Sequence, residues 1–329
     1  MALLDKGRQV TADAIIQTTP RQGIHWEFEK LDRCPVCHGA EFSVVFVGEI
    51  RSVPLQFTKC ASCGLIVQNP RPTRRALKDY FSSRTFIEDS SAADYDLEQP
   101  LGYHNYSEWD ASYKATASLR LKRIMAYRPP PAKLLEIGTA TGSFLDVARR
   151  FGYAVRGIDV STLFAEMARR KYGLDIDSHF IEDAPLPPAT YDVVCNFGGI
   201  SCWREPVRAL VNIRRSLTPN GIFVLNFSDI DALVGRLLGR WYPEFNHASL
   251  SVFSTATIQR TLQTAGFDPV FFETERQYAS IGRIVTYFRS RTGRWLANRL
   301  RIDNVTIPVV AIGTVFGVCL PSARASVAY

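Results

Sequence analysis

Short apolar runs alternate with amphipathic stretches through the central part of this chain. The apolar runs have the length of buried strands, and the stretches between them have the periodicity of helices. Such an alternation predicts a doubly wound α/β sheet, and the apolar segment 307–320 is expected to add an antiparallel last strand. The predicted strands cover residues 134–137, 155–160, 191–196, 222–227 and 267–273, and the predicted helices cover 143–150 and, after the capping Ser161, 162–171.

A turn with two glycines follows the first predicted strand. Glu136 lies near the end of that strand, Gly138 and Gly142 lie in the turn, and a helix begins directly afterwards. Glycines at this place let the backbone turn tightly and approach a ligand. The second predicted strand ends near Asp159, where a carboxylate is placed to accept hydrogen bonds from both hydroxyls of a ribose. The two acids and the turn between them predict an adenosine ligand.

Four segments carry a family resemblance. They are Glu136-x-Gly138-x-Ala140-x-Gly142, Gly157-Ile-Asp159, Tyr191-Asp-Val-Val194 and Leu217-Thr-Pro-Asn-Gly-Ile-Phe-Val-Leu225. In order and spacing they resemble the signature series of class I S-adenosylmethionine-dependent methyltransferases, over roughly residues 130–275. A dinucleotide-binding turn has the spacing G-x-G-x-x-G, whose third glycine would fall on Ser143. Ala140 departs from the family, which more commonly has glycine there.

The resemblance implies a Rossmann-like, seven-stranded methyltransferase sheet with helices on both faces, and S-adenosylmethionine as cofactor. In the family an acid after the third strand lies near the adenine amino group, and here that acid is Glu182 or Asp183. A segment ahead of the first strand supplies a tyrosine, for which Tyr106 is the candidate; packing onto the core is its alternative role. The expected cofactor-binding residues are Glu136, Gly138, Thr139, Ala140, Gly142, Asp159, Val160, Glu182, Asp183, Asn196 and Tyr106.

Four of the seven cysteines form two C-x-x-C pairs. Short strands are predicted between the pairs, over 42–47 and 54–57, as in a zinc ribbon. Four thiolates complete a tetrahedral zinc site, so the expected zinc is structural. Disulfides are the alternative, which the absence of a secretory signal disfavours. The expected zinc ligands are Cys34, Cys37, Cys60 and Cys63.

The ribbon and the segment Gly64-Leu-Ile-Val-Gln-Asn69-Pro-Arg-Pro72 resemble the front end of a bacterial subgroup of these methyltransferases. That subgroup includes sugar C-methyltransferases and enzymes of natural-product and surface-polysaccharide pathways. The resemblance implies methyl transfer to a small molecule, a sugar or another pathway intermediate, nucleotide- or carrier-linked. Two other classes stay open: a methyltransferase that modifies RNA or protein, and a non-catalytic adenosine-binding scaffold.

In-line methyl transfer requires an aligned nucleophile and, for a hydroxyl or a carbon acid, a group that removes a proton. Relatives often have a Leu-Glu-His triplet after the fourth strand, where this chain has Ile200-Ser201-Cys202. His247 is therefore the first candidate for the general base, because an imidazole titrates near neutral pH. A structural, hydrogen-bonded histidine is the alternative. Tyr242 and Glu244 are weaker catalytic candidates.

The chain divides into five predicted segments. They are an arm (1–28), a zinc ribbon (29–72), a helical and aromatic lid segment (73–128), a cofactor-binding core (129–275), and a C-terminal helix with the last strand (276–329).

Composition and charge narrow the setting. Hydrophobic residues make up 46% and charged residues 22% of the chain, as in ordinary globular proteins. The net charge of +7 comes without a dense basic stripe, so nucleic acid is not the indicated partner. The apolar segment 307–320 is too short to span a bilayer, which leaves a peripheral lipid contact open. A cytoplasmic protein is expected, and the sequence does not predict its oligomeric state.

Overall fold

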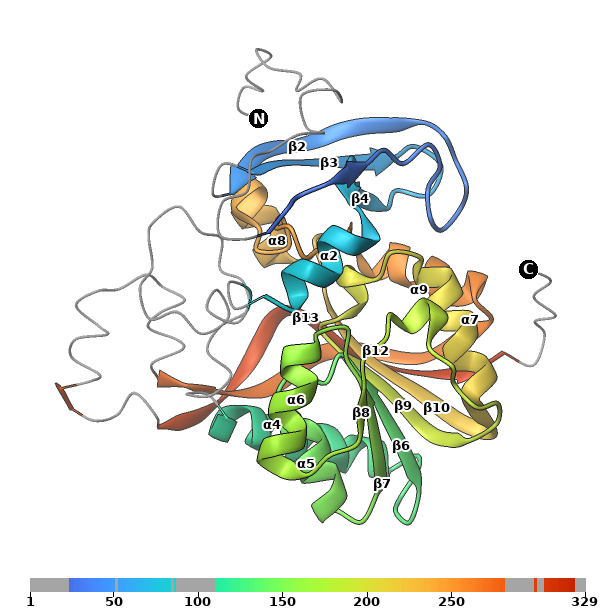
Figure 1. Cartoon of the computed structure of the whole chain (residues 1–329), viewed down its shortest axis with the longest axis vertical. Helices are drawn as coiled ribbons and strands as arrows, with labels where there is room; N and C mark the ends of the chain where they lie inside the picture. Colours follow the sequence, from blue (N-terminus) through green and yellow to red (C-terminus); the bar gives the residue numbers. More distant parts are fainter. Residues whose placement is uncertain are drawn as a thin grey trace.

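The structure is a computed structural model that describes residues 24–50, 53–83, 86, 110–281, 299–300 and 305–322 (Figure 1). Within this part of the chain, a seven-stranded sheet has helices on both faces, and a smaller four-stranded sheet lies at one end. Tyr106, most of the arm and the helix expected in the C-terminal segment fall outside the described residues.

Seven strands form the large sheet: β6 (Lys133–Ile137), β7 (Ala154–Ile158), β8 (Ile176–Asp177), β9 (Tyr191–Phe197), β10 (Leu217–Ser228), β12 (Phe267–Ser280) and β13 (Thr306–Pro321). Their order is β12-β13-β10-β9-β6-β7-β8. The five strands from β10 to β8 are parallel, whereas β13 is antiparallel to both of its neighbours. This arrangement is the methyltransferase-type sheet that the sequence implied, and it confirms the antiparallel last strand.

Five helices pack on this sheet: α4 (Asp110–Met125), α5 (Ser143–Arg150), α6 (Thr162–Tyr172), α7 (Pro206–Ser216) and α9 (Thr255–Thr264). The first three contribute buried residues to one hydrophobic cluster, and the last two contribute to another. Ser161 Oγ accepts a hydrogen bond from the backbone N–H of Phe164 (3.2 Å), which confirms the predicted cap of α6. No helix in the described ranges is both long and apolar enough to cross a membrane.

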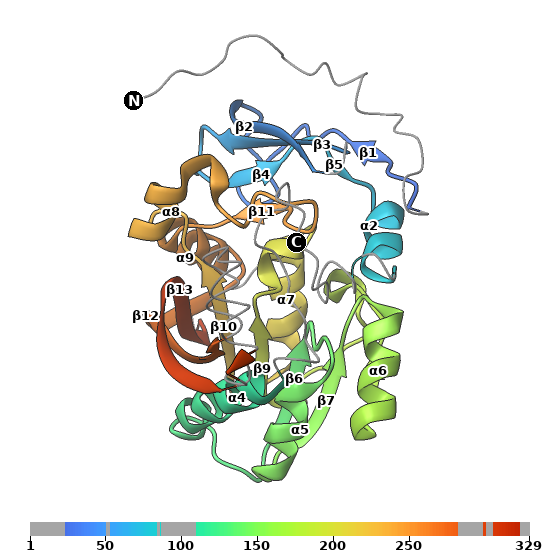
Figure 2. The same ribbon diagram turned by 90° about the vertical axis from the view of Figure 1, so that its left-hand side faces the viewer.

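The small sheet contains β2 (Phe42–Ile50), β3 (Val53–Cys60), β4 (Ile66–Gln68) and β11 (Ser251–Val252), in the order β11-β4-β3-β2. β11 comes from the insertion that follows β10, so a segment of the core completes the sheet of the ribbon. This sheet lies beyond the ends of β9 and β10 at which the chain leaves the large sheet (Figure 2). The ribbon therefore covers the carboxyl edge of the parallel strands.

Buried contacts join the ribbon to the core. Cys34 and Leu65 belong to the same hydrophobic cluster as Phe253 and residues of α9. Arg71, in the short strand β5 (Arg71–Pro72), donates a hydrogen bond to the carbonyl of Arg204 in the core (2.7 Å). This guanidinium also pairs with Glu29 of β1 (Phe28–Glu29) and with Glu205. The described parts of ribbon and core thus form one packed body.

Candidate functional site

The turn after β6 takes left-handed backbone angles at three positions. The angle φ is 74° at Gly138, 45° at Ala140 and 79° at Gly142. Such an angle costs a residue with a Cβ about 1–2 kcal/mol, which explains why glycine is commoner at position 140 in the family. A methyl group on Gly142 would lie 2.7 Å from Leu174 Cδ1 and 3.0 Å from Ala168 Cβ. Gly142 is therefore needed for packing.

Asp159 is held just beyond the end of β7 by two backbone amides. Its Oδ2 accepts a hydrogen bond from Ala140 N (2.8 Å), and its Oδ1 accepts one from Ser161 N (2.8 Å). Burial raises the pKa of Asp159 to about 6, and the two amides act in the opposite direction. At neutral pH the carboxylate is therefore mainly ionised and fixed in position, as a hydrogen-bond acceptor for a ribose requires.

Asp159 lines a cavity that we name the Asp159 pocket. Its other walls are mainly aromatic and aliphatic. They include Phe81, Phe86, Val160, Phe164, Phe180, Ile181 and Asn196. An apolar slot with a fixed carboxylate suits a nucleoside, because the base packs against the apolar walls and the sugar hydroxyls donate to the acid.

Glu182 and Asp183 follow β8, where the adenine-binding acid was expected. Glu182 Oε1 accepts hydrogen bonds from the backbone N–H of Arg204 (2.7 Å) and of the next residue (3.2 Å). Asp183 forms ion pairs with Arg74 and with Arg208. Of the two acids, Glu182 lines the Asp159 pocket and Asp183 does not. The side chain of Glu182 also fixes the loop after β9.

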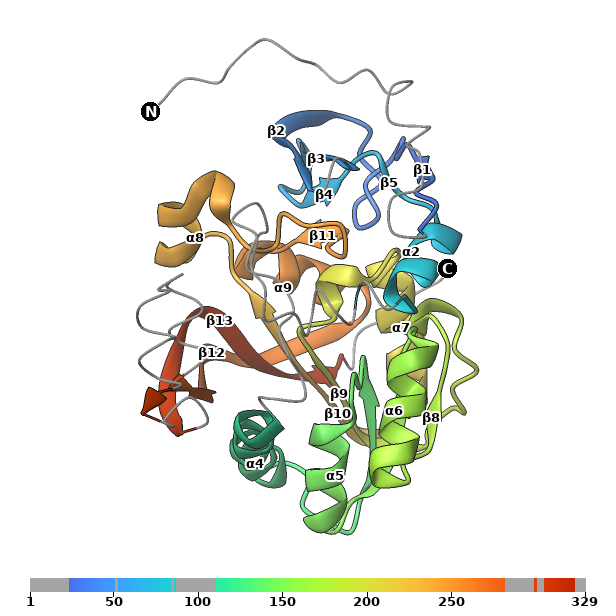
Figure 3. The ribbon, with the colours of Figure 1, turned by 60° about the vertical axis from the view of Figure 1, so that its left-hand side comes forward.

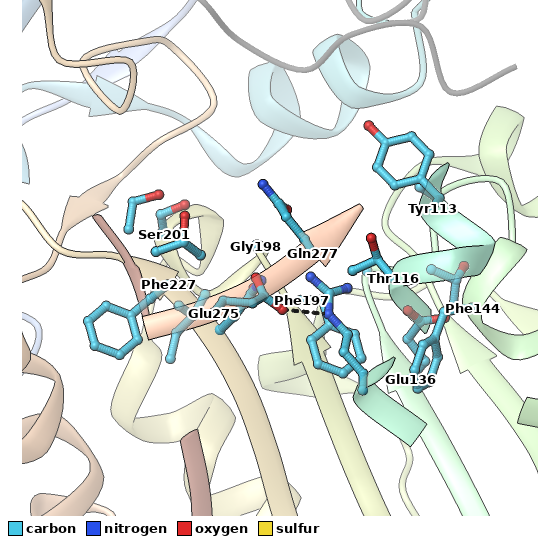
Figure 4. A pocket seen from close by; sticks show the side chains of 18 of the residues that line it. Tyr113, Thr116, Glu136, Phe144, Phe197, Gly198, Ser201, Phe227, Glu275 and Gln277 are labelled. Atoms are coloured by element: carbon cyan, nitrogen blue, oxygen red, sulfur yellow. Dashed lines mark hydrogen bonds and ion pairs between the residues drawn. The ribbon is translucent and has the colours of Figure 1, made fainter. Parts of the chain in front are cut away.

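A second cavity, which we name the Glu275 pocket, meets the Asp159 pocket at the glycine turn. Figure 4 shows side chains that line the Glu275 pocket. Gly138, Ala140, Phe197 and Gly198 line both cavities. The rest of the lining comes from β6, the glycine turn and the start of α5, from α4, from the loop after β9, from the end of β10 and the insertion after it, and from β12 and β13. The carboxyl edge of parallel strands is where open α/β sheets bind their ligands.

Two buried polar atoms near the turn have no hydrogen-bond partner among the described residues. They are Glu136 Oε2 and Thr139 Oγ1, and both residues line the Glu275 pocket. Burial raises the pKa of Glu136 well above its usual range; the charge of Arg120 acts against this rise and that of Asp159 adds to it. Buried polar groups normally have partners, so these atoms fit a polar or cationic ligand at the turn.

Three side chains that the sequence analysis missed form a buried polar network at the Glu275 pocket. Arg120 Nε lies 2.7 Å from Glu275 Oε1, and Asn226 Nδ2 donates to Glu275 Oε2 (2.7 Å). The guanidinium carbon lies 4.1 Å from the centre of the Phe197 ring, and Figure 4 shows the ion pair of Glu275 above that ring. Asn226 Oδ1 is buried without a partner in the described part of the chain. A polar residue within an apolar strand is a signal that could have found Asn226, whereas Glu275 lies among other polar residues of β12 and no local signal distinguishes it.

The structure places the two catalytic candidates, His247 and Tyr242, away from both pockets. His247 is buried with its ring 4.9 Å from that of Trp26, and it lines neither pocket. Burial lowers the pKa of His247 to about 4, so the imidazole is neutral. Tyr242 packs in a buried cluster with Phe57 and Phe245, also away from both pockets. The insertion turns these side chains toward the ribbon, which their spacing in the sequence did not reveal.

Four thiols converge at one end of the ribbon. The sulfur of Cys34 lies 3.5 Å from that of Cys63, the sulfur of Cys37 lies 3.6 Å from that of Cys60, and all four lie within 4.8 Å of one another. Zinc–sulfur bonds of about 2.3 Å in a tetrahedron place the sulfurs roughly 3.8 Å apart. In each pair, the carbonyl of the first cysteine accepts a hydrogen bond from the amide four residues later. The cluster fits a four-coordinate zinc ion.

A family model described as a methyltransferase domain matches residues 109–270. Squalestatin tetraketide synthase of Phoma sp. is 28% identical over 204 residues, and compactin diketide synthase of Penicillium citrinum is 31% identical over 193 residues. These matches cover 54% and 52% of this chain but only 8% and 7% of the two synthases, so the chain spans less than a tenth of the length of these curated relatives.

Among solved structures, an S-adenosylmethionine-dependent methyltransferase of Thermotoga maritima is 20% identical, with a TM-score of 0.45. The match covers 65% of this chain and 93% of that one. The family match at residues 109–270 spans the glycine turn, Asp159 and the parallel strands described above. Residues 109–270 therefore match a methyltransferase domain, and the strand order of the large sheet is that of the methyltransferase sheet which the motif series implied.

Proposed function

We propose that this protein transfers the methyl group of S-adenosylmethionine to a small hydroxylated acceptor, a sugar or another biosynthetic intermediate, bound in the Glu275 pocket. The observation that carries the proposal is that the Asp159 and Glu275 pockets share the turn at Gly138 and the strand end at Phe197. A nucleoside in the first pocket has its reactive end directed toward the second. In-line displacement needs this adjacency.

On the cofactor side, each assigned residue has a distinct task. Asp159 accepts hydrogen bonds from the ribose hydroxyls, and Val160 with Ile181 encloses the adenine. Glu136 and Thr139, whose buried oxygens have no partner among the described residues, contact the amino-acid end. The bound cofactor supplies an already activated methyl group, so the protein has to orient the acceptor and take up its proton.

The acceptor side of the Glu275 pocket is rich in hydrogen-bonding groups. Its polar lining includes Thr116, Asn226, Ser228, Glu244, Ser251, Glu275, Gln277 and Thr314. Phe227 and Phe253 supply apolar surface. A wall of this kind suits a molecule with several hydroxyls, whereas a long acyl chain leaves such groups without partners. This polarity supports a sugar-like acceptor, free or linked to a nucleotide or another carrier.

Two carboxylates of the acceptor wall are suited to act on a hydroxyl. Glu275 already accepts hydrogen bonds from Arg120 and Asn226, which fixes its position and favours a role in orienting the acceptor. Glu244 Oε2 accepts a hydrogen bond from Ser249 (2.7 Å), and no ion pair joins Glu244 to a cation within the described residues. We assign proton uptake to Glu244, since both carboxylate oxygens of Glu275 already accept hydrogen bonds from Arg120 and Asn226.

The ribbon has a supporting role in this proposal. Cys34, Cys37, Cys60 and Cys63 hold a structural zinc ion, whose four positions are filled by thiolates. β4 pairs with β11 through Val67 and Ser251, and Ser251 lines the Glu275 pocket. The zinc therefore stabilises one wall of the acceptor site without contacting the acceptor.

The test combines cofactor binding with an acceptor screen. Calorimetry with S-adenosylhomocysteine is expected to give micromolar binding, which Asp159→Ala weakens and Asn226→Leu leaves unchanged. Turnover, followed as S-adenosylhomocysteine released, is then measured with nucleotide sugars and, as the contrasting class, with short acyl thioesters. Turnover of nucleotide sugars that is lost in Asn226→Leu supports the proposal. Turnover of acyl thioesters alone contradicts the acceptor class. Binding of S-adenosylhomocysteine without turnover of any acceptor favours the non-catalytic adenosine-binding scaffold, and failure to bind it contradicts the cofactor assignment.

A further inference from the structure

The insertion after β10 exposes three large apolar side chains. It contains α8 (Leu233–Leu238) and a short 3-10 helix, η3 (Gly239–Trp241). Leu233 is 67% exposed, Leu237 is 76% exposed and Trp241 is 67% exposed. Leu233 and Leu237 lie four residues apart in α8 and so share one face of the helix, and Trp241 follows four residues later. Exposed apolar side chains that gather in this way mark a surface that binds something.

The opposite side of α8 is anchored to the protein. A methyl group on Gly235 would lie 2.1 Å from the carbonyl oxygen of Ile230, so the helix packs directly on the preceding backbone. A Cβ on Gly313 of β13 would lie 3.5 Å from Val234 Cβ. Leu238 packs against the buried cluster beneath the ribbon. The exposed side chains therefore project from a fixed support.

Two arginines alternate with these apolar residues. Arg236 and Arg240 are exposed and immediately precede Leu237 and Trp241. The guanidinium carbon of Arg240 lies 5.5 Å from the centre of the Trp241 ring. We name these five residues the α8 ridge: Leu233, Arg236, Leu237, Arg240 and Trp241. Leucine, tryptophan and arginine on one short element are typical of segments that lie in the headgroup region of a bilayer.

The α8 ridge lies close to the Glu275 pocket. Phe227 and Ser228, just before the insertion, line that pocket, as do Glu244 beyond η3 and Thr314 of β13. Figure 3 shows α8 projecting at one side of the molecule, above β13 and next to the ribbon. A surface that receives the ridge is thereby brought near the acceptor site.

We propose that the α8 ridge docks this protein onto an anionic lipid surface. The ridge holds three large apolar side chains in solvent on a fixed support, which suits insertion into a deformable lipid surface. Its two arginines complement anionic headgroups, in keeping with the chain's net charge of +7. The apolar segment 307–320, at which the sequence left a lipid contact open, pairs with β12 along most of its length and with β10 over residues 314–319, and Val310 and Ile312 within it are exposed.

Co-sedimentation of the full chain with vesicles tests this proposal. The probes are vesicles of phosphatidylcholine alone and of phosphatidylcholine with phosphatidylglycerol. We expect the protein to pellet with the anionic vesicles and the variant Leu233→Ser/Leu237→Ser/Trp241→Ser to stay in the supernatant. Arg236→Gln/Arg240→Gln should weaken binding to anionic vesicles about fivefold for each charge removed. Leu237→Ser alone, at the most exposed position, should act in the same direction as the triple variant.

The matched control is Val44→Ser/Val47→Ser on β2, which removes exposed apolar surface from the ribbon. It should pellet as the wild type does, and S-adenosylhomocysteine binding shows that each variant is folded. The proposal is overturned if the wild type remains in the supernatant with both kinds of vesicle, or if the control loses binding to the same extent. It is also overturned if the wild type forms dimers that the triple variant does not form, since the ridge then binds a second copy of the chain.

Discussion

The Asp159 pocket and the Glu275 pocket share a turn but are built in different ways. Around Asp159, backbone amides position the carboxylate and apolar side chains enclose the space. Around Glu275, side chains from α4, β10 and β12 position one another through an ion pair and a hydrogen bond. The first arrangement suits a ligand common to a whole family, because few of its contacts depend on side-chain identity. The second arrangement changes with single substitutions and so suits a ligand particular to this protein.

Removal of zinc should separate the two pockets most clearly, because it should abolish acceptor turnover and spare cofactor binding. Chelation, or Cys60→Ser, is expected to unfold the ribbon, since structural zinc sites contribute on the order of 10 kcal/mol to folding. Ser251 and Phe253 then lose their support, so acceptor turnover should disappear while S-adenosylhomocysteine still binds. Calorimetry and turnover on the same sample make the comparison, with Cys319→Ala as a cysteine control. Equal loss of S-adenosylhomocysteine binding and acceptor turnover would show that both pockets depend on the ribbon.

Breaking the ion pair should destabilise the fold. Glu275→Leu leaves Arg120 buried beside Phe197 without its carboxylate, which costs about 3–5 kcal/mol. The double variant Arg120→Met/Glu275→Leu should recover most of this loss in urea denaturation and yet remain inactive. A double variant as unstable as the single one would mean that the ion pair is not the cause of the loss.

Asp159→Ala is the counterpart on the cofactor side. Loss of a charged hydrogen-bond acceptor is expected to weaken S-adenosylhomocysteine binding by about 1.5–3 kcal/mol, measured by calorimetry. Asn226→Leu, the matched change in the other pocket, should leave that affinity unaltered. Unchanged affinity in Asp159→Ala would remove the ribose assignment.

Cofactor affinity should also depend on pH through Asp159. Its pKa is raised from 3.8 to about 6 in the folded protein. The protonated carboxyl therefore stabilises the fold of the free protein fully below pH 3.8, and this stabilisation is lost as the pH rises through 6. The ribose requires the ionised form, so affinity should be highest above pH 6 and fall by up to about tenfold per unit below it. Titrations at several pH values measure this, and Asp159→Ala should show a smaller dependence.

His247→Gln should have the smallest effect on turnover, because the imidazole lies outside both pockets. Its effect should appear in stability. Because the pKa of His247 is lowered from 6.5 to about 4, the neutral ring contributes fully to the free energy of unfolding above pH 6.5. This contribution is lost as the pH falls toward 4. Unfolding free energies measured over this range should vary less in the variant. A complete loss of turnover would restore His247 as the base.

The parts of the molecule that sequence predicted are those that depend on local chain geometry. The glycine turn, the Ser161 cap and the two C-x-x-C pairs each involve residues close together in the chain, and their spacing alone predicts the backbone conformation. The strand order follows from the family resemblance that these motifs carry.

The Glu275 pocket depends on contacts between distant residues. Arg120 and Glu275 are separated by 155 positions, and no local pattern links them. The position of His247 could not be predicted for the same reason: its ring contacts Trp26, which is 221 positions away in the chain, and only the docking of the insertion brings the two together. Asn226, a polar residue inside an apolar strand, is the residue of this pocket that the sequence could have indicated.

The most direct test of the account is a crystal structure of the protein with S-adenosylhomocysteine. We expect the ribose hydroxyls on Asp159, the adenine between Val160 and Ile181, and the sulfur facing the Glu275 pocket. A nucleoside bound among Asn226 and Glu275, or a sulfur directed away from them, would contradict the assignment of the two pockets.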